Sequence, residues 1–177
     1  MTVAEYLRTP ETVLPQELIF GTLRVAEAPL PRHQRAVGHL FLALHEHVSE
    51  LTLGEVWLSP IDVILDTSRH LVVQPDLLFI SNGRSHILTD RIRGGPDLVV
   101  EVLSPNPRIG KIDERVEWYA EYGVDECWLV DLFARRVDVL TLGKLGVSSR
   151  QTYDQSTLIS SQVLPEFSLT LGGILGF

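Results

Sequence analysis

GGPDLVVEVLSPNPRIGKIDERVEWYAEYGVDECWLVD, residues 94–131, is the stretch that decides the fold. Residues 98–103 form a short, apolar, β-branched run, and the run is bounded by Pro96, Pro105 and Pro107, which predicts a buried strand rather than a helix. Glu101 interrupts this run. An ionised carboxylate in an apolar strand is costly unless it is paired or binds a metal. Two interpretations follow: a salt bridge at the end of a strand, or a functional carboxylate.

A helix and a second strand are predicted after this run. Residues 109–122 carry Ile112, Val116 and Tyr119 at helical spacing, and Gly123 follows as a helix stop. The apolar run 126–131 predicts a strand, which residues 136–142 join in a hairpin.

Two cations share one stripe of the predicted helix, because Lys111 and Arg115 lie four residues apart. A functional cation near Glu101 is one interpretation. A solvated helix face, with Arg115 paired to Asp113 or Glu114, is the structural alternative.

A second carboxylate, Asp76, lies in the apolar stretch 70–80, HLVVQPDLLFI, which we predict as one strand. Since side chains alternate along a strand, Asp76 shares a face with Leu78, and Glu101 shares one with Val99. Two adjacent strands could therefore present Asp76 and Glu101 side by side.

The N-terminal half contributes two further candidates. Residues 16–26 predict two short strands around Gly21, and Glu17, at the head of the first, is favoured from its position as an exposed strand-end charge. Residues 33–49 predict the first long helix, and His33 lies in its first turn, at the end expected to face a cleft. The other predicted elements are a short helix at 2–7, a strand at 54–66, and a polar tail from 147 that ends in an apolar closing segment at 164–177.

Composition limits the functional classes. The chain has 177 residues, ordinary globular hydrophobicity and no apolar run long enough to span a bilayer, so we expect one domain over residues 1–177 and no membrane. A single cysteine, Cys127, and the lack of a signal-peptide pattern fit the cytoplasm, and Cys127 is expected in the core. The net charge of −8 argues against broad binding of polyanions. No Walker, GxGxxG or GxSxG motif is present, so nucleotide hydrolysis and serine-esterase chemistry have no support.

Seven segments along nearly the whole chain resemble one bacterial family of restriction-endonuclease-like proteins, abundant in cyanobacteria and formerly described as a domain of unknown function. They are MTVAEYL (1–7), QELIFG (16–21), PRHQRAVGHL (31–40), VQPDLLFI (73–80), PDLVVEVLSPNP (96–107), YAEYGVDECWLVD (119–131) and LPEFSLTL (164–171). The family is part of the PD-(D/E)XK nuclease superfamily.

This resemblance implies an α/β fold with a restriction-endonuclease-like core, in which a mixed central β-sheet is flanked by helices and an N-terminal β-hairpin is added. It also implies that Asp76 and Glu101 bind Mg²⁺ or Mn²⁺ and that a nearby cation stabilises charge on a phosphodiester. In the superfamily pattern a lysine lies two residues after the Glu, and this chain has Leu103 there. In the family, the lysine lies on the following helix instead, and this chain has Arg115 at that position. One turn earlier the family usually has an acidic residue, where this chain has Lys111.

We therefore expect a metal-dependent endonuclease that hydrolyses DNA and works as a homodimer. Asp76 and Glu101 are the expected metal ligands, Arg115 or Lys111 the cation, and Glu17 and His33 peripheral members of the catalytic site. The alternative is a nuclease-fold protein without catalysis that binds nucleic acid or another protein. The acidic net charge and the Lys111 and Arg115 departures favour the alternative, whereas the intact carboxylate pair favours the enzyme.

Overall fold

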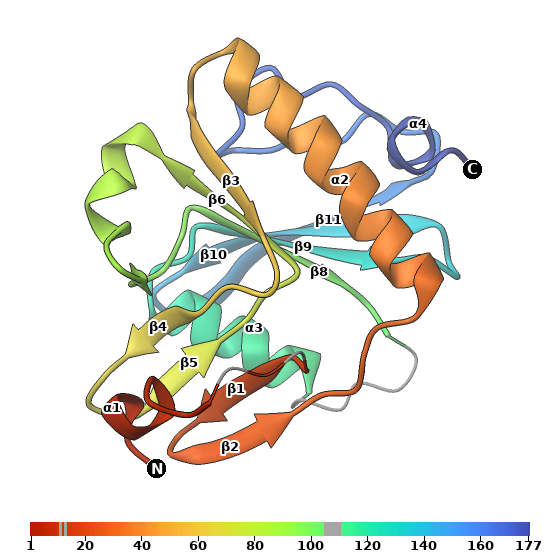
Figure 1. Ribbon diagram of the computed structural model, residues 1–177. Helices are drawn as coiled ribbons and strands as arrows, with labels where there is room; N and C mark the ends of the chain where they lie inside the picture. The colour runs from red at the N-terminus through yellow and green to blue at the C-terminus, as the bar shows by residue number, and fades with distance from the viewer. Residues whose placement is uncertain (11, 13, 105–110) are drawn as a thin grey trace.

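The computed structural model describes residues 1–10, 12, 14–104 and 111–177. A sheet of six strands forms its centre, in the order β11-β10-β9-β8-β6-β3 (Figure 1). These strands are β3 (Gly54–Leu58), β6 (Leu77–Ser81), β8 (Leu98–Val102), β9 (Glu126–Asp131), β10 (Arg136–Gly143) and β11 (Gly146–Asp154). β8 runs parallel to β9 and antiparallel to β6, so the sheet is mixed. The expected α/β class with a mixed sheet is confirmed.

A second sheet has the strand order β2-β1-β5-β4-β7 within the described residues. Its members are β1 (Gln16–Ile19), β2 (Thr22–Val25), β4 (Val63–Asp66), β5 (Leu71–Val73) and β7 (Ile92–Arg93). The predicted N-terminal hairpin is β1–β2, and its turn holds Phe20 and Gly21 at φ values of 47° and 83°. Two successive residues with positive φ suit a two-residue hairpin turn. The hairpin extends this second sheet through the pairing of β1 with β5.

The central sheet is covered by helices on both faces (Figure 1). On one face α2 (Pro31–Glu50) and α4 (Leu171–Leu175) pack on residues such as Leu77, Leu98 and Trp128. On the other face α3 (Ile112–Glu121) packs on residues such as Leu78, Val99 and Cys127. The short helices α1 (Val3–Tyr6) and η1 (Asn82–Ile87) complete the described elements. None of the helices in the described ranges is long and apolar enough to cross a membrane.

Several predicted elements are confirmed. The predicted short helix is α1, where Thr2 and Glu5 form a capping box, and Gly123, at φ 80°, follows α3 in the left-handed conformation that glycine adopts without steric cost. The apolar stripe of α3 packs on the sheet as expected, and Cys127 is fully buried. The predicted helix start at Ile109, and the prolines Pro105 and Pro107, lie outside the described residues.

Three boundaries differ from the prediction. The stretch 54–66 is two strands, β3 and β4, which belong to different sheets and are separated by the cis Ser59–Pro60 peptide. The stretch 70–80 is likewise divided into β5 and β6, because Gln74, Pro75 and Asp76 carry the chain from one sheet to the other. The segment predicted as a polar tail forms a nine-residue edge strand, β11. Its side chains are mostly polar and exposed, so the sequence contains no apolar run that would predict a strand there.

Candidate active site

Asp76 and Glu101 lie on one face of the central sheet. The antiparallel pairing of β6 with β8 matches Leu77 with Val100 and Leu78 with Val99. Continuing this register by one residue in each strand places Asp76 opposite Glu101, on the face of Leu78 and Val99. The two carboxylates are close enough that the negative charge of Asp76 raises the pKa of Glu101. Asp76 precedes β6 rather than standing in the middle of a strand, which corrects one detail of the prediction.

Asp76 is held at the carboxyl end of β8. Its Oδ2 atom accepts a hydrogen bond from the backbone N–H of Val102 at 2.8 Å and lies 3.2 Å from Nε2 of His33. The same His33 nitrogen lies 3.1 Å from the carbonyl oxygen of Val102. The hydrogen bond with Asp76 is the main cause of a raised His33 pKa, against the opposing effect of burial. The N-terminal turn of α2 therefore reaches Asp76, and His33 lines a cavity, as expected for the end of the helix that faces a cleft.

Glu101 receives three hydrogen bonds on a single oxygen. Its Oε1 atom accepts from Nη2 of Arg115 at 2.7 Å, from Nε of Arg115 at 3.1 Å, and from the hydroxyl of Tyr119. Nη2 of Arg115 also donates to the Tyr119 hydroxyl oxygen at 3.0 Å. Arg115 and Tyr119 are one helical turn apart on α3, so this face of the helix presents both donors to the strand.

Glu17 completes the buried charge cluster. Nη1 of Arg115 donates to Oε2 of Glu17 at 2.6 Å, and the backbone N–H of Gln74 donates to Oε1 of Glu17 at 2.6 Å. Glu17 is 2% exposed and Arg115 7% exposed. The interpretation of Glu17 as an exposed strand-end charge is wrong, and so is the solvated-face interpretation of Arg115. Neither result could be derived from local sequence, because the partners come from β1 and α3, which are distant in the chain.

Burial and charge act in opposition on this cluster. Burial raises the pKa of the Glu101 carboxyl, while the neighbouring Arg115 guanidinium lowers it, and the net direction is upward. Burial lowers the pKa of Arg115, but Glu101, Tyr119 and Glu17 together outweigh this effect and raise the pKa well above its usual value. Arg115 is therefore a permanent cation in this site.

Lys111 is not brought to the carboxylates. It is the exposed N-cap residue of α3, and it is not among the described residues that line the cavity beside Asp76 and Glu101. Positions 111 and 115 are one turn apart, but the helix begins only after Lys111, and the described structure gives Lys111 no ion pair with Asp76 or Glu101. Its candidacy as the site cation is therefore not supported by the geometry.

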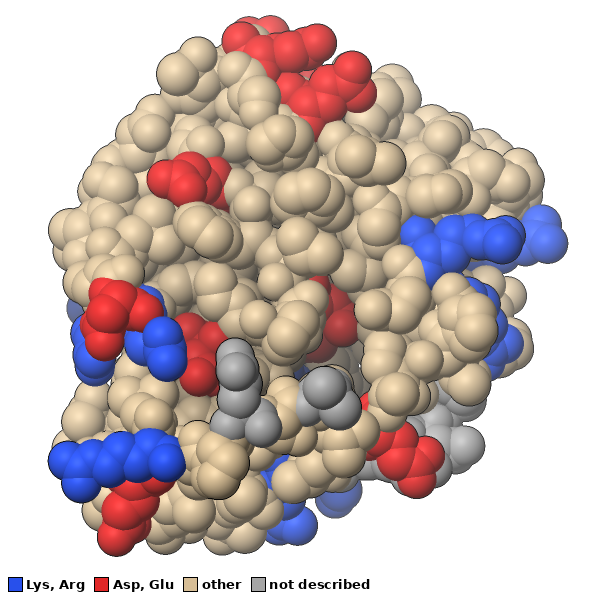
Figure 2. All heavy atoms as spheres, in the orientation of Figure 1, with Lys and Arg blue, Asp and Glu red and all other residues tan. Residues whose placement is uncertain are grey.

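A cavity of about 1450 Å³ brings these side chains together. Glu17, His33, Asp76, Glu101 and Arg115 all line it. The described residues of its wall include seven carboxylates, against three arginines: Glu17, Glu27, Glu55, Asp62, Asp76, Asp90 and Glu101, against Arg32, Arg91 and Arg115. Figure 2 shows acidic side chains in the hollow near the middle of this face. The cavity is therefore a strongly negative environment that suits a cation.

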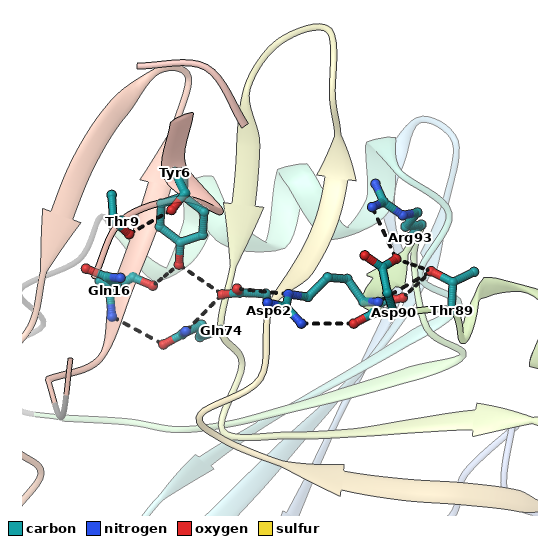
Figure 3. Close-up of polar contacts among 9 residues, drawn as sticks. Tyr6, Thr9, Gln16, Asp62, Gln74, Thr89, Asp90 and Arg93 are labelled. Carbon is teal, nitrogen blue, oxygen red and sulfur yellow. Dashed lines mark hydrogen bonds and ion pairs between the residues drawn. The ribbon is translucent and has the colours of Figure 1, made fainter. Parts of the chain in front are cut away.

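A second polar network lies on the cavity wall and was not predicted (Figure 3). Its centre is Asp62, whose Oδ1 accepts from the hydroxyl of Tyr6 and from Nε2 of Gln74, both at 2.9 Å. Oδ2 of Asp62 lies 3.9 Å from Nε of Arg91. Gln74 connects the two networks, because its backbone N–H binds Glu17. The position of Gln74 directly before Pro75 and Asp76 is the one sequence signal that could have identified Gln74 as a residue of the site.

Metal-binding capacity rests on the carboxylate pair. Within the described ranges, no group of three or more His, Cys, Asp or Glu side chains has the arrangement of a metal site. Mg²⁺, however, is commonly bound by one or two carboxylates, with water and substrate oxygens completing its shell.

Comparison with known proteins assigns the family. A family model described as "Putative restriction endonuclease" (Uma2) matches residues 3–172. The chain belongs to the Uma2 family. The predicted family resemblance is thus confirmed, and it places the Uma2 chain among nuclease-like proteins.

One solved structure has the same fold as this Uma2 chain over nearly its full length. It is the crystal structure of a putative nuclease belonging to DUF820 from Anabaena variabilis, with a TM-score of 0.82 and 18% sequence identity. The match covers 99% of this chain and 98% of the other. No curated protein matches the sequence.

Proposed function

We propose that this protein is a metal-dependent phosphodiesterase that cleaves DNA, with Asp76 and Glu101 as the metal ligands. One observation carries the proposal: Asp76, immediately before β6, and Glu101, in the neighbouring strand β8, lie on one face of the sheet and line the same cavity, and Glu101 is bonded to a buried guanidinium. Membership in a family of restriction-endonuclease-like proteins supports the reaction class.

The donor set fits a hard divalent cation. The hydrogen bonds from described residues fall on Oδ2 of Asp76 and Oε1 of Glu101, which leaves the second oxygen of each carboxylate available. Oxygen donors and an excess of negative charge suit Mg²⁺ or Mn²⁺. When bound, such an ion would lower the pKa of a water molecule and neutralise charge on the phosphodiester.

The chain's own residues would orient this site. His33 and the Val102 N–H hold Asp76, while Arg115 and Tyr119 hold Glu101. Arg115 also supplies a fixed positive charge beside the place where negative charge develops on the phosphate. Because arginine stays protonated, it stabilises charge and does not act as a proton shuttle.

A nuclease-fold protein without catalysis is the second candidate, and the same Arg115 favours it. Within the described residues, the guanidinium donates four of its five N–H groups to Glu17, Glu101 and Tyr119, so most of its hydrogen-bonding capacity is committed inside the protein rather than to a substrate. In this case the protein would bind nucleic acid or a protein partner and cleave nothing.

A cleavage assay separates the two candidates. Single-stranded, duplex and branched DNA are incubated with the protein and Mg²⁺ or Mn²⁺, and Asp76→Asn and Lys111→Ala are run in parallel. The enzyme proposal expects metal-dependent cleavage that Asp76→Asn abolishes and that Lys111→Ala retains. The absence of cleavage from all three substrates with both metals supports the second candidate.

Two further features belong to this proposal: a homodimer and a cytoplasmic location. Sedimentation equilibrium of the purified chain should give twice the monomer mass. Cell fractionation should recover the protein with cytoplasmic markers.

A further inference from the structure

An arginine and an exposed phenylalanine stack together on the wall of the same cavity. The guanidinium carbon of Arg32 lies 4.0 Å from the centre of the Phe133 ring. Phe133 is 64% exposed, and both residues line the cavity that contains Asp76 and Glu101. We call Arg32 and Phe133 the stacking pair.

Both members of the stacking pair are fixed close to the ends of the strands that carry the site. Arg32 precedes His33 in the first turn of α2, and His33 binds the carboxyl end of β8. Phe133 follows β9, the parallel neighbour of β8, and Oδ1 of Asp131 accepts from the backbone N–H groups of Phe133 and Ala134, each at 2.9 Å. The ring is therefore displayed by an ordered turn on the wall of the cavity that also contains the carboxylate pair.

Charge limits how a nucleic acid could be held here. Carboxylates outnumber arginines among the described residues of the cavity wall, so neutralisation of phosphates by this wall contributes little to binding. Stacking of a base on an aromatic ring does not require a positive surface, and an adjacent arginine adds a cation–π contact. In the stacking pair, the guanidinium of Arg32 covers one face of the Phe133 ring, so a base would stack on the exposed remainder of the ring with the cation held against the opposite face.

We propose that Arg32 and Phe133 bind one unpaired nucleobase next to the phosphodiester that Asp76 and Glu101 address. This inference rests on the proposed function and specifies its substrate class. In a duplex the faces of a base are covered by its neighbours, whereas a single strand, a frayed end or a flap exposes them. The substrate is therefore nucleic acid that is unpaired at the site of cleavage.

Direct binding tests the stacking pair without requiring cleavage. Anisotropy of a fluorescent single-stranded oligonucleotide, measured in EDTA, gives the affinity of wild type, Phe133→Ala, Phe133→Trp and Arg32→Ala. Loss of one stacked base predicts that Phe133→Ala weakens binding about 5- to 150-fold. Phe133→Trp retains the affinity, since the larger ring still stacks, and Arg32→Ala weakens it less than Phe133→Ala does.

The chain contains a matched control. Phe177 is also exposed and lies under an arginine, with Arg135 at 5.1 Å, but neither residue lines the cavity among the described parts of its wall. Phe177→Ala should bind the oligonucleotide as wild type does. Equal melting temperatures for the two alanine variants would show that any difference in binding is local.

Each outcome decides the inference. A wild-type protein that binds no single strand, or a Phe133→Ala variant with wild-type affinity, overturns it. An equal loss of affinity for a fully paired duplex overturns the preference for an unpaired base. Failure of wild type to cleave any DNA removes the proposed function, yet the binding measurement still reports on the stacking pair, so the two failures are distinguishable.

Discussion

Nη1 of Arg115 and Oε2 of Glu17 are 2.6 Å apart in the protein interior, although 98 residues separate them in the chain. This ion pair connects α3 to the N-terminal hairpin and places Glu17 near the Asp76–Glu101 pair. Breaking a buried ion pair by removing one partner leaves an uncompensated charge, which is more costly than the pair is stabilising. The site and the stability of the fold therefore depend on the same contact.

Glu17→Gln should lower the free energy of unfolding by about 3–5 kcal/mol, the usual cost of breaking a buried ion pair. Glutamine preserves the size of the side chain and leaves Arg115 with Glu101 as its remaining ionised partner. Urea unfolding followed by circular dichroism, with linear extrapolation to water, measures the change.

The exposed ion pair between Arg69 and Glu121 is the matched control, since both side chains are about half exposed. Glu121→Gln should change the stability by less than about 1 kcal/mol. Similar effects of Glu17→Gln and Glu121→Gln would contradict the special cost of the buried pair.

Arg115→Lys tests the departure from the family's lysine position. A single ammonium cannot reach Glu17, Glu101 and Tyr119 with the fork that arginine provides, so the variant should be less stable by about 1–3 kcal/mol. Any metal-dependent cleavage should nevertheless be retained or raised in Arg115→Lys and reduced by orders of magnitude in Arg115→Ala. Cleavage rates measured well below each variant's unfolding midpoint keep the two effects separate.

Lys111→Ala is the control for Arg115, because Lys111 is exposed at the N-terminus of the same helix. It should retain full activity and stability. Full activity in Arg115→Ala would instead indicate that Lys111 is the site cation. Full activity in the double variant Lys111→Ala, Arg115→Ala would indicate that α3 has only a structural role.

Local patterns were sufficient for much of the fold. The apolar run around Glu101, the helical spacing of Ile112, Val116 and Tyr119, and Gly123 after the helix each reflect interactions within a few residues. Side-chain alternation also predicted correctly that Asp76 and Glu101 face the same side, because neighbouring strands in register share that side.

These local patterns could not predict contacts between side chains that are distant in the chain. The environment of Glu17 depends on Arg115, and the environment of Asp62 depends on Tyr6, Gln74 and Arg91. The division of 70–80 between two sheets also has no apolar signature, because both halves are buried. The prediction that Asp76 lies on the same sheet face as Glu101 is therefore confirmed, but its assignment to the middle of a strand is wrong.

Tyr6→Phe tests the network around Asp62. The Tyr6 hydroxyl donates to the Gln16 carbonyl at 3.0 Å and to Asp62 at 2.9 Å, and the variant leaves both acceptors without this donor. Stability should fall by about 1–3 kcal/mol. Tyr153→Phe, which removes an exposed hydroxyl bonded to Gln151, should be nearly neutral in the same urea titration. Equal losses of stability in Tyr6→Phe and Tyr153→Phe would indicate that the hydrogen bonds around Asp62 do not specifically stabilise the N-terminal segment.

Glu101→Gln should abolish binding of Mg²⁺ or Mn²⁺ while the protein remains folded. The substitution removes a ligand charge at nearly constant volume and relieves the repulsion that Asp76 exerts on Glu101. The glutamine oxygen still accepts from Arg115 and Tyr119, and Glu17 still neutralises the guanidinium. Isothermal titration calorimetry measures the affinity, with Asp62→Asn as the control, since Asp62 is a carboxylate of the same cavity outside the pair. If Glu101→Gln binds the ion as tightly as wild type, or if Asp62→Asn loses binding equally, Asp76 and Glu101 are not the ligands and the ion is attracted by the general negative charge of the cavity.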